Sequence, residues 1–175
     1  MSGSLVTVIA ALLAPLAVII TYYDVRYRRI PNAFVIAALT SGLIINTIYG
    51  GISGTLLSLG GCAIAFMLMF ILHIFGAMGA GDVKLFAAVG SLTGAQLVLP
   101  TFLVVVLTGG ALALLLTLRS GAVRATMQRV LQILVGLLPG WEMPRFAIPA
   151  DRRHTIPYGV AITFGSLISL AIFRA

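Results

Sequence analysis

The chain has 175 residues, of which 61% are hydrophobic and only 9% are charged. Soluble domains typically carry about 25% charged residues, so the composition excludes an ordinary soluble fold, and it equally excludes disorder and collagen-like architecture. The formal net charge of +7 indicates contact with a membrane surface rather than with nucleic acid, because no solvated basic face stands apart from the apolar runs. The single cysteine, Cys62, lies within an apolar run, so we expect no intramolecular disulfide and no cysteine-based zinc site.

Apolar segments long enough to cross a bilayer recur along the chain. The first, residues 5–23, follows a polar start without basic residues, so we interpret it as a retained transmembrane helix rather than a signal peptide. Pro31, Pro100 and the glycine-rich stretches 50–54 and 76–81 mark further boundaries. The sequence therefore predicts an all-α polytopic membrane protein in which residues 1–175 form a single membrane-embedded domain. Its six predicted transmembrane helices cover residues 5–23, 33–49, 55–75, 83–97, 101–118 and 156–173.

The distribution of basic residues predicts the orientation. With six crossings, one side of the membrane receives the segments 24–32, 76–84 and 119–155, which hold every Lys and Arg except Arg174. Short cytoplasmic loops are enriched in Lys and Arg, so we expect these segments in the cytoplasm and both termini outside it. The basic cytoplasmic loop 119–155, between the fifth and sixth helices, fits either a helix at the inner membrane surface or a packing helix, and we assign it no chemistry.

The four acidic residues fall into two kinds. Glu142 and Asp151 lie in the long basic segment, where solvation or ion pairing explains them. Asp24 and Asp82 each lie where an apolar helix meets the cytoplasmic side, and acids at membrane depth are costly enough to mark functional sites. Each has a simple structural alternative: Asp24 as an interfacial residue paired with Arg28, and Asp82 as a helix N-cap. These alternatives leave their common face and depth unexplained.

Two carboxyl groups at one site are suited to hydrolysis of an amide. Like charges that lie close together do not both ionise readily, so the pair holds one proton near neutral pH. The ionised partner takes a proton from an attacking water while the protonated partner donates to the carbonyl oxygen. Such a pair at a membrane surface predicts an aspartic protease that cuts membrane-inserted substrates.

Three motifs occur in order along the chain. The first begins at Asp24, continues through Arg26, Arg28 and Arg29, and ends in Ile-Pro-Asn at residues 30–32; the second is the GxGD run Gly79-Ala80-Gly81-Asp82 with Lys84; the third is Pro157-Tyr158-Gly159. With these motifs the chain resembles the type IV prepilin peptidase family, the GxGD membrane aspartic proteases. It is most similar to the short members that serve tight-adherence, or Flp-type, pili.

This resemblance implies an activity and its residues. Asp24 and Asp82 would be the catalytic pair, and the family removes a short basic leader from prepilins at the cytoplasmic face of the membrane. The resemblance therefore also implies that the protein lies in a bacterial inner membrane. Gly79 and Gly81 would shape the approach to Asp82, while Lys84 either tunes a nearby carboxyl or binds substrate, or serves only as a cytoplasmic topology charge. Possible substrate-binding residues are Arg26, Arg28, Arg29, Pro157 and Tyr158.

The same resemblance indicates the partners. They are a membrane-inserted prepilin, membrane lipid and possible pilus assembly machinery. Larger members add a region with paired Cys-x-x-Cys motifs that is associated with N-methylation, and this sequence has none. We therefore expect a peptidase with no methyltransferase region, no cofactor and no metal.

A serine-protease alternative comes from Gly51-Ile52-Ser53-Gly54, a GxSG pattern like that of rhomboid proteases. His73 lies about 20 residues further along the same predicted helix, roughly 30 Å from Ser53, and His154 lies in the cytoplasmic segment, so neither would reach the serine. Two other classes stay open. A small proton-coupled transporter predicts acids spread across the bilayer depth, and a non-catalytic subunit of a secretion or pilus complex predicts that both acids are replaceable.

Overall fold

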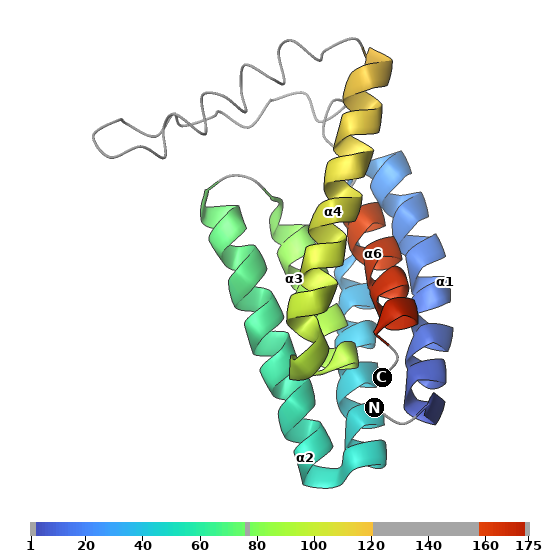
Figure 1. Cartoon of the computed structure of the whole chain (residues 1–175), viewed down its shortest axis with the longest axis vertical. Helices are drawn as coiled ribbons and strands as arrows, with labels where there is room; N and C mark the ends of the chain where they lie inside the picture. Colours follow the sequence, from blue (N-terminus) through green and yellow to red (C-terminus); the bar gives the residue numbers. More distant parts are fainter. Residues whose placement is uncertain (1–2, 76–77, 121–157, 174–175) are drawn as a thin grey trace, which may run out of the picture. The chain divides into compact units, whose positions relative to one another are not determined.

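A computed structural model describes residues 3–75, 78–120 and 158–173, and all the secondary-structure elements in this part of the chain are helices (Figure 1). The all-α class is therefore confirmed. Contacts divide the chain into two compact units, residues 1–109 with 157–175 and residues 110–156, and the account below concerns the first. The helices are α1 (Gly3–Tyr27), α2 (Asn32–Ile74), α3 (Ala80–Thr93), α4 (Ala95–Ser120) and α6 (Tyr158–Ile172).

Helix α2 is a helical hairpin rather than one straight rod. Gly51 has non-helical backbone angles, φ 57° and ψ −141°, and divides it into arms 32–50 and 52–74 that run side by side (Figure 1). A positive φ favours glycine because it has no Cβ. Thr47 Oγ1 and Thr55 Oγ1 lie 2.8 Å apart across the turn, and a Cβ on Gly54 would collide with the carbonyl oxygen of Asn46. The turn predicted within residues 50–54 is confirmed.

Helix α3 packs between the two arms of α2 through small residues. A Cβ on Gly42 of the first arm would collide with Ser91 Oγ, and one on Gly61 of the second arm would collide with the carbonyl oxygen of Gly90. Small residues let helix backbones approach closely, which is how helices associate within a bilayer. Almost every residue from Val83 to Thr93 is buried, so α3 is the central helix of this unit.

Polar side chains of α2 hold the C-terminal end of α3. The last carbonyls of a helix lack partners within it. Asn46 Nδ2 donates to Ser91 O at 3.0 Å and to Leu92 O at 3.1 Å, and Ser58 Oγ donates to Ser91 O at 2.8 Å. Both arms of α2 therefore contribute donors that satisfy this end of α3.

Helix α6 lies between α1 and the first part of α4. Thr101 Oγ1 of α4 and Ser169 Oγ of α6 are 2.9 Å apart, and a Cβ on Gly165 would come within 2.9 Å of Val105. Helices α1 and α6 run in opposite directions, so the end of α1 lies beside the start of α6 (Figure 1). This arrangement brings residues from the two ends of the sequence together.

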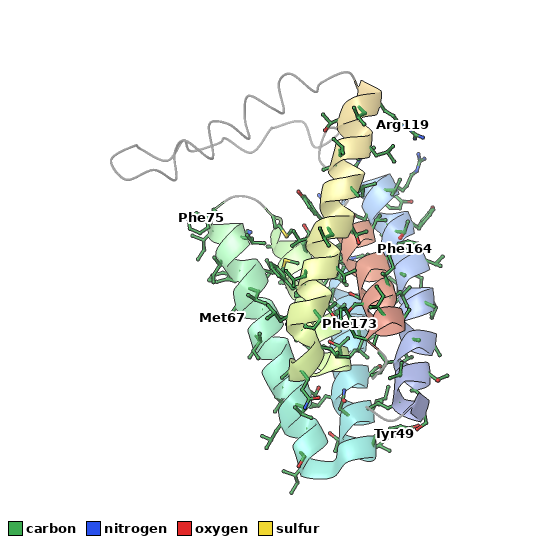
Figure 2. All side chains as sticks on the ribbon, viewed as in Figure 1. Tyr49, Met67, Phe75, Arg119, Phe164 and Phe173 are labelled. Atoms are coloured by element: carbon green, nitrogen blue, oxygen red, sulfur yellow. The ribbon has the colours of Figure 1, made fainter. Side chains whose placement is uncertain are left out.

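The outer surface is apolar while polar groups lie inside. Helices α1, α2 and α4 are each long and apolar enough to cross a membrane, and among their exposed side chains Ile52 is 82% exposed and Met67 is 57% exposed. Figure 2 shows Tyr49 and Met67 of α2, and Phe75 directly after it, projecting outward. Large apolar side chains facing out, with small and polar residues at the contacts between helices, are typical of a membrane protein.

Two predicted boundaries are wrong. Helix α1 continues to Tyr27 instead of ending at residue 23, so Asp24 lies inside its last turns rather than in a loop. The break expected at Pro100 lies at Gly94, whose φ of 74° ends α3, and α4 restarts at Ala95 with Pro100 inside it. Pro100 lies in the second turn of α4, where its missing N–H removes one hydrogen bond of the helix without ending it.

The six-crossing count stays a prediction. Helices α3 and α6 have 14 and 15 residues, fewer than the about 20 that cross a bilayer perpendicularly. The backbone is helical as far as Ser120, and the remainder of the predicted basic segment 119–155, with Pro157 and His154, lies outside the described residues.

Candidate active site

Asp24 is buried at the contact between α1 and α6. Its side chain is 8% exposed, and its Oδ2 accepts a hydrogen bond from the backbone N–H of Gly159 at 2.8 Å. The N–H of Val160 also faces this carboxyl group. The first N–H groups of a helix have no partners within it and carry a partial positive charge, so the start of α6 forms a suitable environment for a carboxylate.

Gly159 is the residue that permits this contact. A Cβ there would lie 2.8 Å from Asp24 Oδ2 and 3.1 Å from Ile20 Cγ2, both closer than ordinary packing allows. The preceding residue, Tyr158, is partly buried and places its ring against α4, 3.5 Å from where a Cβ on Gly109 would be. The start of α6 is therefore fixed by α1 on one side and by α4 on the other.

Asp82 is partly buried in the first turn of α3. Its Oδ2 accepts a hydrogen bond from the backbone N–H of Gly79 at 3.2 Å. Gly79 is the N-cap of α3 and Asp82 is the third helical residue, so the N-cap alternative for Asp82 is wrong by three positions. The carboxyl still satisfies a free N–H at the helix start, as an acid at this position commonly does. Ile30, between α1 and α2, packs beside Gly81 at 3.7 Å from its Cβ position.

The two acids are within electrostatic range of each other. Burial and the negative charge of Asp24 raise the pKa of Asp82 to about 6, while the hydrogen bond from Gly79 opposes the shift. Asp82 precedes the apolar part of α3 and lies outside the three helices long enough to cross a membrane. Tyr158 also interacts electrostatically with Asp82. The structure thus gathers Asp24, Asp82 and Tyr158 from three helices.

The predicted basic residues take different places. Arg28 lies close enough to Asp24 to interact with its charge, and its backbone N–H donates to Asp24 O at 3.1 Å while its φ of 53° ends α1. The charges of the two residues therefore interact, while a direct ion pair between their side chains stays a prediction. Arg26, Arg29 and Lys84 are exposed. Among the described residues, no group of three or more His, Cys, Asp and Glu is arranged to hold a metal ion.

Two contacts were not anticipated from the sequence. Gly159 was noted only as part of a motif, and its hydrogen bond to Asp24 depends on the packing of α1 against α6. His73 Nδ1 donates to Met78 O at 2.8 Å and so anchors the residue that precedes the GxGD run. His73 and Ser53 lie near opposite ends of the second arm of α2, as predicted.

Comparison with known families gives one match. The model of the type IV leader peptidase family matches residues 11–114, more than half of the chain. The matched region includes both Asp24 and Asp82 and ends before α6. No curated protein and no solved structure matches the chain significantly.

Proposed function

The chain belongs to the type IV leader peptidase family, and from this premise we propose that it is an aspartic endopeptidase with Asp24 and Asp82 as its catalytic pair. One observation carries the assignment: Asp24 and Asp82 are the only acids among the described residues, and they interact electrostatically although they come from different helices. A solitary acid at a helix end has a structural explanation, but two that converge in so apolar a protein suit proton transfer.

The pair performs amide hydrolysis in two steps. The ionised carboxylate takes a proton from water as the water oxygen bonds to the scissile carbonyl carbon, and the protonated carboxyl gives its proton to the carbonyl oxygen. The tetrahedral intermediate then collapses: the carbonyl re-forms, the C–N bond breaks, and the leaving nitrogen receives a proton. Each carboxyl thus returns to its starting protonation state, and no metal or cofactor takes part in the proposal.

The proposed substrate is a type IV prepilin, of the Flp type used in tight adherence, whose short basic leader is removed at the cytoplasmic membrane face. The concentration of basic residues around both acids supports a cytoplasmic site. The hairpin of α2 supports six crossings, since each of its arms has about the 20 residues that a crossing needs. Both termini then lie outside the cytoplasm. We further propose that Arg26 and Arg29 meet an acid of the mature pilin segment, which their exposure supports.

The test is cleavage of a co-expressed Flp-type pilin precursor, followed as a mobility shift. Asp24→Asn and Asp82→Asn keep the side-chain shape but remove the proton chemistry, so both are expected to lose cleavage at normal membrane abundance. Glu142→Gln is the matched control, because it makes the same kind of change at an acid outside the pair. Full cleavage by either aspartate variant would refute the assignment and favour the transporter or the non-catalytic subunit.

A further inference from the structure

The two carboxyl groups of the pair have unequal surroundings. Asp24 Oδ2 accepts from Gly159 at 2.8 Å at the positive end of α6, with Val160 N–H facing it and Arg28 within electrostatic range. Asp82 Oδ2 accepts from Gly79 alone among the described donors, at 3.2 Å. Hydrogen bonds from N–H groups to a carboxylate favour its ionised form, and shorter ones do so more strongly.

This asymmetry follows from how α6 begins. Helix α6 presents its first backbone N–H groups directly to Asp24, and the missing side chain of Gly159 is what lets the carboxyl approach them. Asp82, by contrast, contacts the start of its own helix, where its carboxyl must reach back to Gly79. The hydrogen bond to Asp24 is 2.8 Å long and that to Asp82 is 3.2 Å long, and Val160 N–H also faces Asp24, so backbone N–H groups stabilise the carboxylate of Asp24 more strongly.

We propose that Gly159 is a positioning residue that keeps Asp24 as the carboxylate, so that Asp24 is the base toward water and Asp82 is the acid toward the substrate carbonyl. This inference rests on the proposed function and assigns roles within the pair. Asp24 removes the proton from water as the C–O bond forms, and Asp82 delivers its own proton to the carbonyl oxygen. When the C–N bond breaks, the leaving nitrogen takes the proton held by Asp24, and Asp82 regains one from the re-forming carbonyl.

The charged and titratable groups around the pair support this division. Burial disfavours a negative charge on Asp24, and the N–H groups of α6 together with Arg28, at the end of α1, oppose that effect. From α6, Tyr158 lies within electrostatic range of Asp82 and is neutral at physiological pH. From α2, the titratable side chain beside the GxGD run is that of His73, whose Nδ1 donates a hydrogen bond to Met78 O. Both acids lie at a helix start, but the Arg28 charge and the shorter N–H bond act on Asp24, whereas Lys84, two residues after Asp82, is exposed.

The first experiment reads protonation directly and does not require activity. Full-length protein carrying ¹³C-labelled aspartate is reconstituted in liposomes, and its carboxyl bands are measured by infrared spectroscopy at about pH 5.5. We expect a protonated-carboxyl band in the native protein that disappears in Asp82→Asn, because Asp24 remains a carboxylate there. A band of native intensity that persists in Asp82→Asn but is absent from Asp24→Asn would assign the proton to Asp24 and overturn the proposal.

The second experiment tests the role of Gly159, in the Asp82→Asn background. Gly159→Ala places a Cβ 2.8 Å from Asp24 Oδ2 and displaces it from its donors, so a protonated-carboxyl band is expected to reappear, since burial disfavours an unpaired charge. Gly165→Ala is the matched control: its Cβ clashes equally, at 2.9 Å from Val105, but further along α6 and away from Asp24. It should leave the band absent.

The third experiment measures how the contact between Gly159 and Asp24 affects the kinetics of cleavage. In the otherwise native protein, Gly159→Ala is expected to lower kcat at least about tenfold with little change in KM, because a positioned base contributes about 10² to 10⁴ in rate. If Gly159→Ala leaves both the infrared spectrum and kcat as in the native protein, the positioning role is refuted. If native protein fails to cut the precursor while the infrared pattern holds, the proposed function fails and the assignment of the proton stands.

Discussion

Replacing Asn46 by alanine tests how firmly α2 holds the helix that carries Asp82. The amide of Asn46 donates to Ser91 O and Leu92 O at the end of α3 and to Gly42 O in its own arm. In Asn46→Ala, Ser91 O keeps the donor Ser58 Oγ, whereas Leu92 O loses the amide. One buried carbonyl deprived of its donor costs about 1 to 3 kcal/mol. Because hydrogen bonds between membrane helices average only about 0.6 kcal/mol, we expect a loss at the lower end of this range, about 1 to 2 kcal/mol.

A double variant makes the prediction sharper. Ser58→Ala alone should cost less than about 1 kcal/mol, because Asn46 still donates to Ser91 O. In the double variant Ser91 O loses both side-chain donors, so the combined loss should exceed the sum of the single losses by at least about 0.5 kcal/mol.

The assay is reversible unfolding by SDS in bicelles, followed by circular dichroism. Thr40→Ala is the matched control, because the Thr40 hydroxyl bonds only to carbonyls of its own helix and is exposed, so its removal should change stability by less than about 0.5 kcal/mol. An Asn46→Ala protein as stable as the control, together with strictly additive losses in the double variant, would refute the conclusion that these donors anchor α3.

Three further predictions concern the pair, the packing and the rejected serine. If Asp82 is the acid, its protonated form is the active one, so with its pKa raised to about 6 the kcat should fall as pH increases above that value; a kcat that rises steadily from about pH 6 to about pH 8 would contradict this. Gly61→Ala would bring a Cβ into the carbonyl oxygen of Gly90 and should reduce folded protein in membranes, whereas Gly60→Ala, with its nearest contact at 3.6 Å, should not; equal abundance of the two would count against the packing. Ser53→Ala should cleave precursor at the native rate, and loss of cleavage at normal abundance would revive serine catalysis.

The helices were largely predictable from the sequence because their signals are local. Long apolar runs predicted the all-α class, and a glycine cluster predicted the hairpin turn that occurs at Gly51. The errors came from residue types that occur both inside helices and at helix ends. Prolines often end helices, but Pro100 lies inside α4. The residue that ends α3 is Gly94, which has a positive φ. We assigned Asp24 to a loop because it is charged, but it belongs to α1 and is buried.

The sequence predicted which residues form the candidate site, but not how they are arranged. Both acids stood out because acids are so rare in this chain, and that needs no knowledge of packing. Whether the hydrogen-bond partner of each acid could be predicted depends on how far apart the two residues lie in the sequence. Gly79 lies three residues before Asp82 and is a local partner, whereas Gly159 reaches Asp24 only because α6 packs antiparallel to α1. No local pattern contains that information.

Both carboxyl groups nevertheless accept a hydrogen bond from a glycine N–H at the start of a helix. Gly79 donates to Asp82 and Gly159 donates to Asp24, in each case to Oδ2. Backbone N–H groups do not titrate and cost little conformational entropy to orient, so they fix the carboxyl groups without adding another charge that would change with pH. The pH dependence of the pair should then reflect the two acids themselves. In the proposed mechanism, the different roles of the two acids follow from which helix supplies the donor.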